Sequence, residues 1–397
     1  MDDKMQRVGN SGKQVRNLYY IRVSERYRIV KWILLLVFAL YLSVMLVAHR
    51  ESMTYENLLY LMRDFNVAYG SSDHFSSVVY EEQPNMSFAS YKDQLVVAGS
   101  AGLSVYSGDG TVTLSDEPNC LSPVLESSDK YLLLYDEGGT FYALYTSLAY
   151  VLRENAQSLI QCAAVSDAGP YAIATRSGES KYSVSLYNAS FQKIASYYRD
   201  NYVIDLSFSS DGKWLVIVGV CAEDGSMCGV LTLCRVGSDE TVEIRLSEQF
   251  PLSAAYLEDG TLAVVTDTSV LLYNRDGVLK HTHPFESMIL TCMNISDTHV
   301  AVVCSENILG TSSRAFVIDS EGRVLIEREF DEKVIAVTAS DGNSAAYVQT
   351  QSAVYYLRVK GGEAFTASYT GNLQAICDVL GQPVFCFPTT ARAAERP

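Results

Sequence analysis

Residues 204–218 read IDLSFSSDGKWLVIV, which is a strand-like run, a turn at Asp211 and Gly212, and a second run of apolar β-formers. Asp can hydrogen-bond the backbone two residues ahead and Gly accepts a positive φ, so this pair favours a tight turn between two strands. The same combination recurs along the chain, which indicates an internal repeat. The turns of its eight copies are at Asp93, Asp129, Asp167, Asp211, Asp259, Asp297, Asp341 and, in a degenerate last copy, Gly381.

Each repeat holds enough residues for four short strands. A third strand such as VLLYNRDG (270–277) follows the apolar run, and a more polar fourth strand such as VLIEREF (324–330) follows that. Four antiparallel strands in roughly 40 residues are typical of a β-propeller blade. The second strand is the most apolar, as expected for a strand covered on both faces, and the fourth is the most charged, as expected for an outer edge that must resist pairing with other chains.

The chain ends determine the number of blades. The last repeat has too few residues for four strands, whereas HFSSVVYEE (74–82) is a spare strand before the first complete blade. We therefore predict an all-β, eight-bladed propeller over residues 73–397, with strand 74–82 completing the last blade. Seven blades with a C-terminal tail are the alternative. The inner strands are expected to begin near Met86, Cys120, Gln161, Tyr202, Leu252, Met288, Lys333 and Leu373.

Charge divides the chain into two regions. The 397 residues carry a net charge of −16, but residues 1–50 contain nine Lys or Arg and only three Asp or Glu. The remaining residues are strongly acidic, which argues against nucleic acid as a partner because binding phosphates requires a basic face. The boundary between the two regions is an uncharged run, WILLLVFALYLSVMLVA (32–48).

This run predicts a single transmembrane helix over residues 29–49. Its 17 residues span roughly 25 Å as a helix, and Lys31 can snorkel to extend it. The run is too long for a signal-peptide core and no small-residue cleavage site follows it; a buried core helix is the other alternative. The basic residues before the run place residues 1–28 in the cytoplasm and the propeller outside the cell membrane. The expected anchor residues are Trp32, Leu36, Leu40, Val44 and Ala48.

Residues 50–72 are expected to form a juxtamembrane linker. Within them YENLLYLMRDF (55–65) has apolar residues at helical spacing, which predicts a short amphipathic helix.

No catalytic, metal-binding or cofactor-binding constellation is apparent. The nine cysteines include no CxxC pair; only Cys221 and Cys228, which bracket a predicted hairpin loop, are placed for a disulfide. His281 and His283 fall on one face of a strand that we expect to face solvent. Tyrosines recur at the ends of third strands, which we interpret as packing between blades. They are Tyr106, Tyr145, Tyr187 and Tyr273.

The basic tail, the single span, the Tyr-Glu-Asn-Leu segment (55–58) and the repeated Ser-Asp-Gly turns resemble a domain-of-unknown-function family of membrane-anchored β-propellers from Gram-positive bacteria. The blades are distantly similar to WD-repeat and quinoprotein propellers, but Trp214 is the only Trp in the ring and no quinone-binding set is present. The resemblance implies a location and a fold, and no catalytic residue.

We therefore expect a non-catalytic scaffold or receptor without a cofactor. Its expected partner is a protein or peptide, or a component of the cell envelope, and the acidic propeller favours a basic one. The alternatives are a sensor that signals to the cytoplasmic tail and, less favoured, a propeller enzyme.

Overall fold

The computed structural model describes residues 27, 30–41, 43 and 74–394, apart from residues 148, 179, 224–225, 342–344 and 360–365. The chain separates into two compact units, Met1–Leu58 and Leu59–Pro397. The predicted helix at 55–65 lies outside the described residues.

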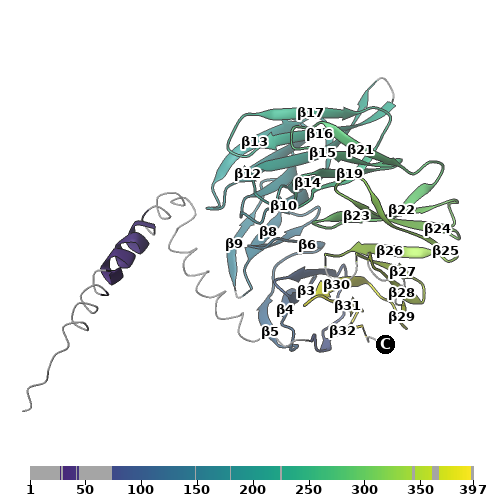
Figure 1. Cartoon of the computed structure of the whole chain (residues 1–397), viewed down its shortest axis with the longest axis horizontal. Coiled ribbons are helices and arrows are strands. Elements are labelled where there is room, and N and C mark those ends of the chain that lie inside the picture. Colours follow the sequence, from purple (N-terminus) through teal and green to yellow (C-terminus); the bar gives the residue numbers. More distant parts are fainter. Residues whose placement is uncertain are drawn as a thin grey trace, which may run out of the picture. The chain divides into compact units, whose positions relative to one another are not determined.

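The second unit is a ring of eight four-stranded antiparallel sheets, which confirms the predicted eight-bladed propeller (Figure 1). Blade 1 is β2 (Ser87–Tyr91), β3 (Gln94–Gly99), β4 (Gly102–Tyr106) and β5 (Val112–Asp116). Blade 2 is β6 (Pro123–Ser127), β7 (Leu132–Asp136), β8 (Phe141–Tyr145) and β9 (Tyr150–Asn155). Blade 3 is β10 (Ile160–Val165), β11 (Tyr171–Arg176), β12 (Tyr182–Tyr187) and β13 (Lys193–Arg199). Blade 4 is β14 (Tyr202–Phe208), β15 (Trp214–Glu223), β16 (Ser226–Arg235) and β17 (Thr241–Leu246).

The remaining blades follow the same order from the inner strand to the outer strand. Blade 5 is β18 (Pro251–Tyr256), β19 (Leu262–Thr266), β20 (Ser269–Tyr273) and β21 (Leu279–Pro284). Blade 6 is β22 (Ile289–Ile295), β23 (His299–Ser305), β24 (Ser313–Asp319) and β25 (Val324–Phe330). Blade 7 is β26 (Val334–Ala339), β27 (Ala346–Thr350), β28 (Ala353–Leu357) and β29 (Thr366–Ser368). Blade 8 is β30 (Ala375–Val379), β31 (Gln382–Cys386), β32 (Thr390–Ala393) and, from the other end of the unit, β1 (Val78–Val79).

The two chain ends meet in blade 8. Val78 pairs with Ala391 and Val79 with Thr390, so β1 is the outer strand of a sheet whose other strands come from the C-terminal end. Tyr80 adds two bonds: its backbone N–H donates to the Thr389 carbonyl at 3.0 Å and its hydroxyl donates to the Phe387 carbonyl at 2.6 Å. The ring is therefore closed by a short strand and one tyrosine side chain.

The core is divided among the blade interfaces. Each of the eight core clusters lies between two neighbouring blades. The second strands β3, β7, β19, β23 and β27 are buried along their whole length, as their apolar sequences predict. Tyr106, Tyr145 and Tyr273 are also buried, in agreement with packing between blades.

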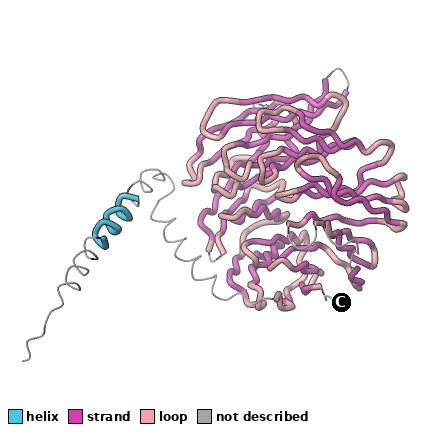
Figure 2. The backbone as a smooth tube through the Cα atoms, in the orientation of Figure 1, coloured by secondary structure: helices cyan, strands magenta, loops and turns pink. Residues whose placement is uncertain are grey.

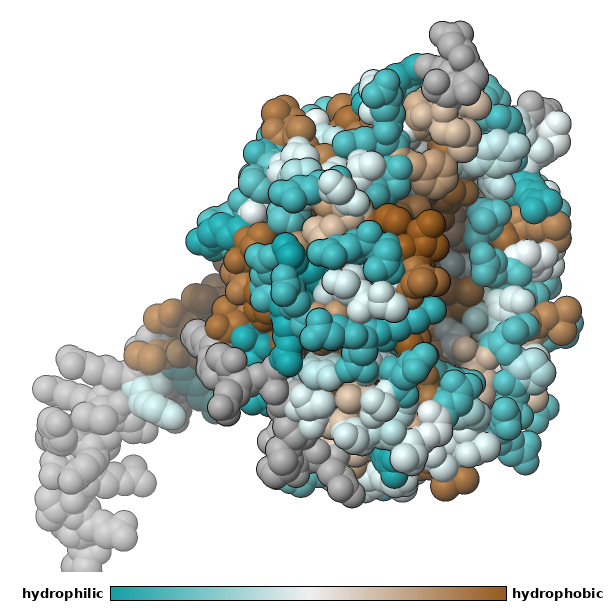
Figure 3. Space-filling model, turned by 90° about the vertical axis from the view of Figure 1, so that its right-hand side faces the viewer, coloured by the Kyte–Doolittle hydropathy of each residue, from teal (hydrophilic) through white to brown (hydrophobic). Residues whose placement is uncertain are grey.

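Strand and tight turn account for almost all of the described part of this unit (Figure 2). On the side drawn in Figure 3, polar side chains cover most of the surface and apolar side chains gather along a furrow.

In the first unit, residues 30–41 are helical and their side chains are exposed. They include three of the five predicted anchor residues, Trp32, Leu36 and Leu40; Val44 and Ala48 lie outside the described residues. No helix in the described residues is both long and apolar enough to cross a membrane, so the predicted span over 29–49 is not observed as such.

Candidate functional site

The repeated turns between the first and second strands meet at one end of the central channel. They surround a cavity of about 630 Å³, which we call the channel mouth. Turns and inner strands from blades 2 to 7 line it, and seven of the lining residues are acidic. These are Glu126, Asp129, Asp167, Asp211, Glu258, Asp297 and Asp341. Among the described residues that line this cavity, none is Lys, Arg or His.

Ring symmetry explains this concentration of charge. In an antiparallel blade every first-to-second-strand turn points to the same end of the ring, so the acidic turn residues of blades 2 to 7 converge on one cavity. Glu126, on β6, adds a further carboxyl group. From the sequence, the repeated aspartates were expected to act as turn formers only, and their convergence on one cavity was not predicted. The recurrence of an acidic residue in the first-to-second-strand turn of most repeats was the signal for it.

Some of the repeated aspartates do close their own turns. Asp211 accepts hydrogen bonds from the Ser209 hydroxyl at 2.7 Å and the Lys213 backbone N–H at 3.1 Å. Asp259 accepts one from the Thr261 backbone N–H at 2.8 Å. These bonds are the expected Asx-turn chemistry.

Two other aspartates bond to the neighbouring blade instead. The Asp167 carboxylate accepts the backbone N–H of Asp129 at 2.9 Å, which joins blade 3 to blade 2. The Asp341 carboxylate accepts the backbone N–H groups of Asp297 at 3.1 Å and Thr298 at 3.2 Å, which joins blade 7 to blade 6. The repeated Asp therefore also fastens one blade to the next.

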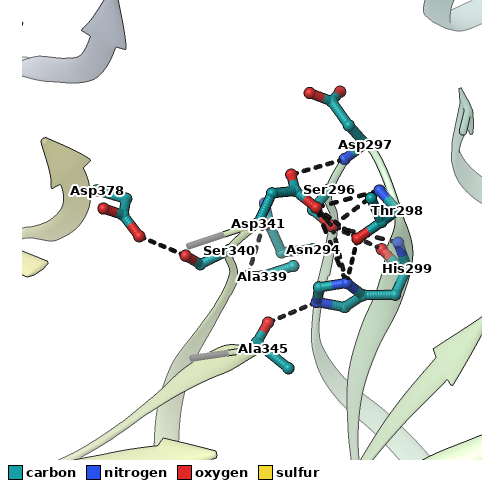
Figure 4. Close-up of polar contacts among 10 residues, drawn as sticks. All are labelled: Asn294, Ser296, Asp297, Thr298, His299, Ala339, Ser340, Asp341, Ala345 and Asp378. Carbon is teal, nitrogen blue, oxygen red and sulfur yellow. Dashed lines mark hydrogen bonds and ion pairs between the residues drawn. The ribbon is translucent and has the colours of Figure 1, made fainter. Parts of the chain in front are cut away.

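Figure 4 shows the junction of blades 6, 7 and 8. His299 is buried there; its Nδ1 lies 2.8 Å from the Thr298 hydroxyl and its Nε2 lies 2.5 Å from the Ala345 carbonyl of blade 7. Ser340 of blade 7 donates to the Asp378 carboxylate of blade 8. The Asp297 carboxylate points away from this network (Figure 4), and no described residue donates a hydrogen bond to it.

Deeper in the channel, acidic and amide side chains cap the backbone of the next blade. Asp205 on β14 accepts hydrogen bonds from the Ser253 hydroxyl at 2.7 Å and the Ala254 N–H at 3.1 Å, both on β18. Asn294 on β22 accepts the Ala339 N–H of β26 at 2.9 Å. The inner edge of each of these sheets would otherwise expose unpaired N–H groups.

Negative charge accumulates at this end of the channel. Burial, followed by the charges of Asp341, Asp167, Asp129 and Glu258, raises the pKa of Asp297 to about 6. Burial, followed by the charge of Asp205, raises the pKa of Glu126 to about 8, although water reaches this side chain along the channel. A cation that entered the channel mouth would relieve this repulsion.

The cysteines and histidines considered in the sequence lie outside the channel mouth. Cys221 and Cys228 pair across β15 and β16 and form a disulfide with a Cα–Cα distance of 5.3 Å. His281 and His283 share one face of β21 as predicted, but they are half-buried instead of solvent-facing, and His283 contacts Phe316 of blade 6 edge-on at 5.2 Å. Across the part of the chain that the structure describes, no group of three His, Cys, Asp or Glu side chains is placed to hold a metal ion.

Two solved structures are distantly similar to this chain. The β-propeller domain of Myceliophteria thermophila Cps50 (Swd1) is 10% identical, with a TM-score of 0.48 over 70% of this chain and 94% of that one. The Neurospora crassa Pan2 WD40 domain is 12% identical, with a TM-score of 0.45 over 69% of this chain and 89% of that one.

No curated protein matches the sequence. A family model, by contrast, matches residues 66–389, which include nearly the whole propeller. The membrane anchor and the Gram-positive origin suggested by the sequence resemblance stay predictions. The chain belongs to the family of unknown function DUF5711.

Proposed function

We propose that the propeller is a non-catalytic interaction module that binds a basic segment of a protein partner at the channel mouth. The single observation that carries the proposal is the circle of seven acidic residues, with no Lys, Arg or His among its described lining residues. Asp211 forms an ion pair with Lys213 at 3.2 Å, so the site has an excess of negative charge that is partly compensated. An excess of one sign in a concave site concentrates ligands of the opposite sign. Lys or Arg side chains of a partner would supply the missing charge.

The carboxylates differ in how available they are to a partner. Asp167, Asp211 and Asp341 are already engaged in hydrogen bonds that hold the turns and blades. Asp297 and Glu258 are exposed. These two residues are therefore the ones to change in a test, because their removal leaves the interblade bonds in place.

The test is binding of a fluorescent octalysine peptide to the full-length protein, followed by fluorescence anisotropy, with octaglutamate as the negative probe. We expect saturable binding of octalysine that weakens as salt rises, because exposed charges are screened. Asp297→Asn with Glu258→Gln should weaken binding roughly fivefold, from about 0.5 kcal/mol for each exposed contact.

A charge-matched control separates the channel mouth from net charge. Glu306→Gln with Asp331→Asn removes the same charge from exposed turns at the opposite end of the ring. This control should keep at least half of the affinity. Equal losses in the two double variants, or no octalysine binding at all, would refute the proposal.

We also propose that residues 29–49 tether the chain to the cell membrane, with residues 1–28 in the cytoplasm and the propeller outside. The uncharged run and the basic residues before it support the tether, and the Cys221–Cys228 disulfide is in keeping with a non-reducing compartment. The chain should stay with membranes after alkaline carbonate washing, and protease added to intact cells should digest the propeller. Release of the chain by carbonate would contradict the membrane tether. Protection of the propeller from the protease would contradict its location outside the cell.

A further inference from the structure

A second cavity, of about 560 Å³, lies between blades 2 and 3, away from the channel mouth. We call it the side groove. One wall is β9, with Leu152, Glu154 and Asn155, and the other is formed by β11, β12 and β13. Its lining runs from Lys193, next to one turn of blade 3, to Gly178, in the turn at the opposite end of that blade. The side groove is therefore elongated along the strands, over roughly 20 Å for six residues of strand.

Aromatic rings form the inner part of the side groove. Tyr142 and Tyr171 are buried behind it, and the rings that a ligand can reach are the half-buried Tyr187 and the exposed Tyr198. Tyr171 and Tyr187 pair across β11 and β12 and stack with ring centroids 4.5 Å apart and planes 1° apart. Tyr142 of blade 2 meets Tyr171 at 6.3 Å. Burial raises the pKa of the Tyr142 and Tyr171 hydroxyls, so these phenols stay protonated and can both donate and accept hydrogen bonds.

Phe191, which also lines the side groove, has an unusual backbone. Its φ is 63°, and its N–H donates to the Asn188 carbonyl at 3.0 Å to close the turn between β12 and β13. Glycine has the same role in the corresponding turns of blades 1, 5 and 6, at Gly110, Gly277 and Gly322. A bulky side chain is disfavoured in this left-handed conformation.

The contacts of the Phe191 ring explain why this turn has a bulky residue at a positive φ where other blades have glycine. It packs against Tyr131 at 5.8 Å and Tyr171 at 6.4 Å and so extends the aromatic wall. The strained backbone of Phe191 therefore places one more aromatic ring at the side groove. The corresponding turns of blades 1, 5 and 6 have glycine at this position and so present no side chain.

The rest of the lining is polar with little net charge. It contributes the amides of Asn155 and Gln157 and the hydroxyls of Ser158, Thr175, Ser177, Ser183 and Ser185. Among the described lining residues the one carboxylate is that of Glu154, and it is accompanied by Arg176 and Lys193. At the open side, Tyr198 leaves 60% of its surface exposed. The side groove is thus aromatic and mostly uncharged, whereas the channel mouth is lined by seven acidic residues.

We propose that the side groove binds an uncharged saccharide chain of several sugar rings. Sugars present alternating apolar C–H faces and hydroxyls, which match a wall of aromatic rings interleaved with amides and hydroxyls. The cavity volume is in the range of small-molecule sites. The nearly balanced charges of Glu154, Arg176 and Lys193 favour a neutral ligand over the cationic segment proposed for the channel mouth.

Saturation-transfer NMR on the full-length protein tests this inference, in a detergent without a sugar head group. The probes are maltotriose, cellotriose and triacetylchitotriose, with the tripeptide Ser-Asn-Ser as a polar non-sugar. We expect at least one trisaccharide to receive saturation from aromatic protons and the tripeptide to receive none. A result in which no trisaccharide is saturated, or in which only the tripeptide is, would overturn the proposal.

Variants locate the binding. Tyr198→Ala and Glu154→Gln should each lower the affinity for the trisaccharide at least tenfold. Tyr202→Ala is the matched control, because Tyr202 is 55% exposed and does not line the side groove, and it should bind normally. Unchanged binding in both side-groove variants would place the sugar elsewhere and refute the assignment.

The outcome is independent of the channel mouth. Asp297→Asn with Glu258→Gln should leave trisaccharide binding unchanged, whereas Tyr198→Ala should leave octalysine binding unchanged. Loss of both ligands in one variant would contradict the existence of two separate sites.

Discussion

Replacement of Asp297 by Asn should stabilise the protein at neutral pH, because the carboxylate is held in an acidic channel mouth without a compensating donor. Burial and the charges of Asp341, Asp167, Asp129 and Glu258 raise its pKa from the ordinary value of 3.8 to about 6. A difference of this size corresponds to about 3 kcal/mol for a fully enclosed group. Asp297 is exposed, and water screens its charge, so we expect a gain of about 1 kcal/mol.

The pH dependence has a definite sign. The folded protein holds the proton of Asp297 more tightly than the unfolded chain, so the destabilisation is fully present above pH 6 and disappears below about pH 4. The stability gained in Asp297→Asn should therefore be largest at pH 7.5 and clearly smaller at pH 5. The wild-type and the Asn variant should converge as the pH falls.

Thermal unfolding followed by circular dichroism measures the effect. A gain of about 1 kcal/mol over a unit of roughly 320 residues raises the Tm by about 1.5 °C. Asp331→Asn, an exposed carboxylate at the other end of the ring, is the control and should change the Tm by less than half as much. An Asp297→Asn variant that is no more stable than the wild type at pH 7.5, or whose gain is the same at both pH values, would refute the electrostatic reasoning.

Three further predictions concern the ring and its turns. Tyr80→Phe removes the hydroxyl that bonds the Phe387 carbonyl in the closing blade and should lower the free energy of unfolding by about 1 kcal/mol in urea titrations; an unchanged midpoint would show that this bond adds nothing to ring closure. Non-reducing peptide mapping should find Cys221 and Cys228 cross-linked. Replacing both by Ser should lower the free energy of unfolding by about 2 kcal/mol, because the disulfide closes only a short loop. An unchanged Tm in the double Ser variant would show that the disulfide does not stabilise the ring. Phe191→Ala should be less stable than Phe191→Gly by about 1 kcal/mol, since only Gly relieves the positive φ, and the reverse order would mean that this turn is not strained.

Much of the propeller was predictable because its determinants are local. The inner strands begin within three residues of the positions expected from the repeats, for example at Tyr202 and at Ile289 where Met288 was expected. Turn residues and runs of β-formers act over fewer than ten residues, so they are visible in the sequence at each repeat. The spare strand before the first blade was visible for the same reason.

Other features depend on which repeats become neighbours. Asp167 is the second residue of its turn, directly after Ser166, whereas Asp211 is the third residue of the corresponding turn, two after Ser209. The first bonds to the neighbouring blade and the second closes its own turn. The position of His283 against Phe316 was likewise mispredicted, because the outer strand of blade 5 packs on blade 6 instead of facing water.

The sequence alone determined the repeat and the order of strands within each blade, because a repeated turn and alternating apolar runs specify these locally. It favoured eight blades closed by both chain ends over seven, and the structure decided between the two. Only the tertiary structure decided that seven acidic residues from six repeats share one cavity and that Phe191 extends an aromatic wall between blades 2 and 3. Both sites are built from residues that are far apart in the chain, and only closure of the ring brings them together.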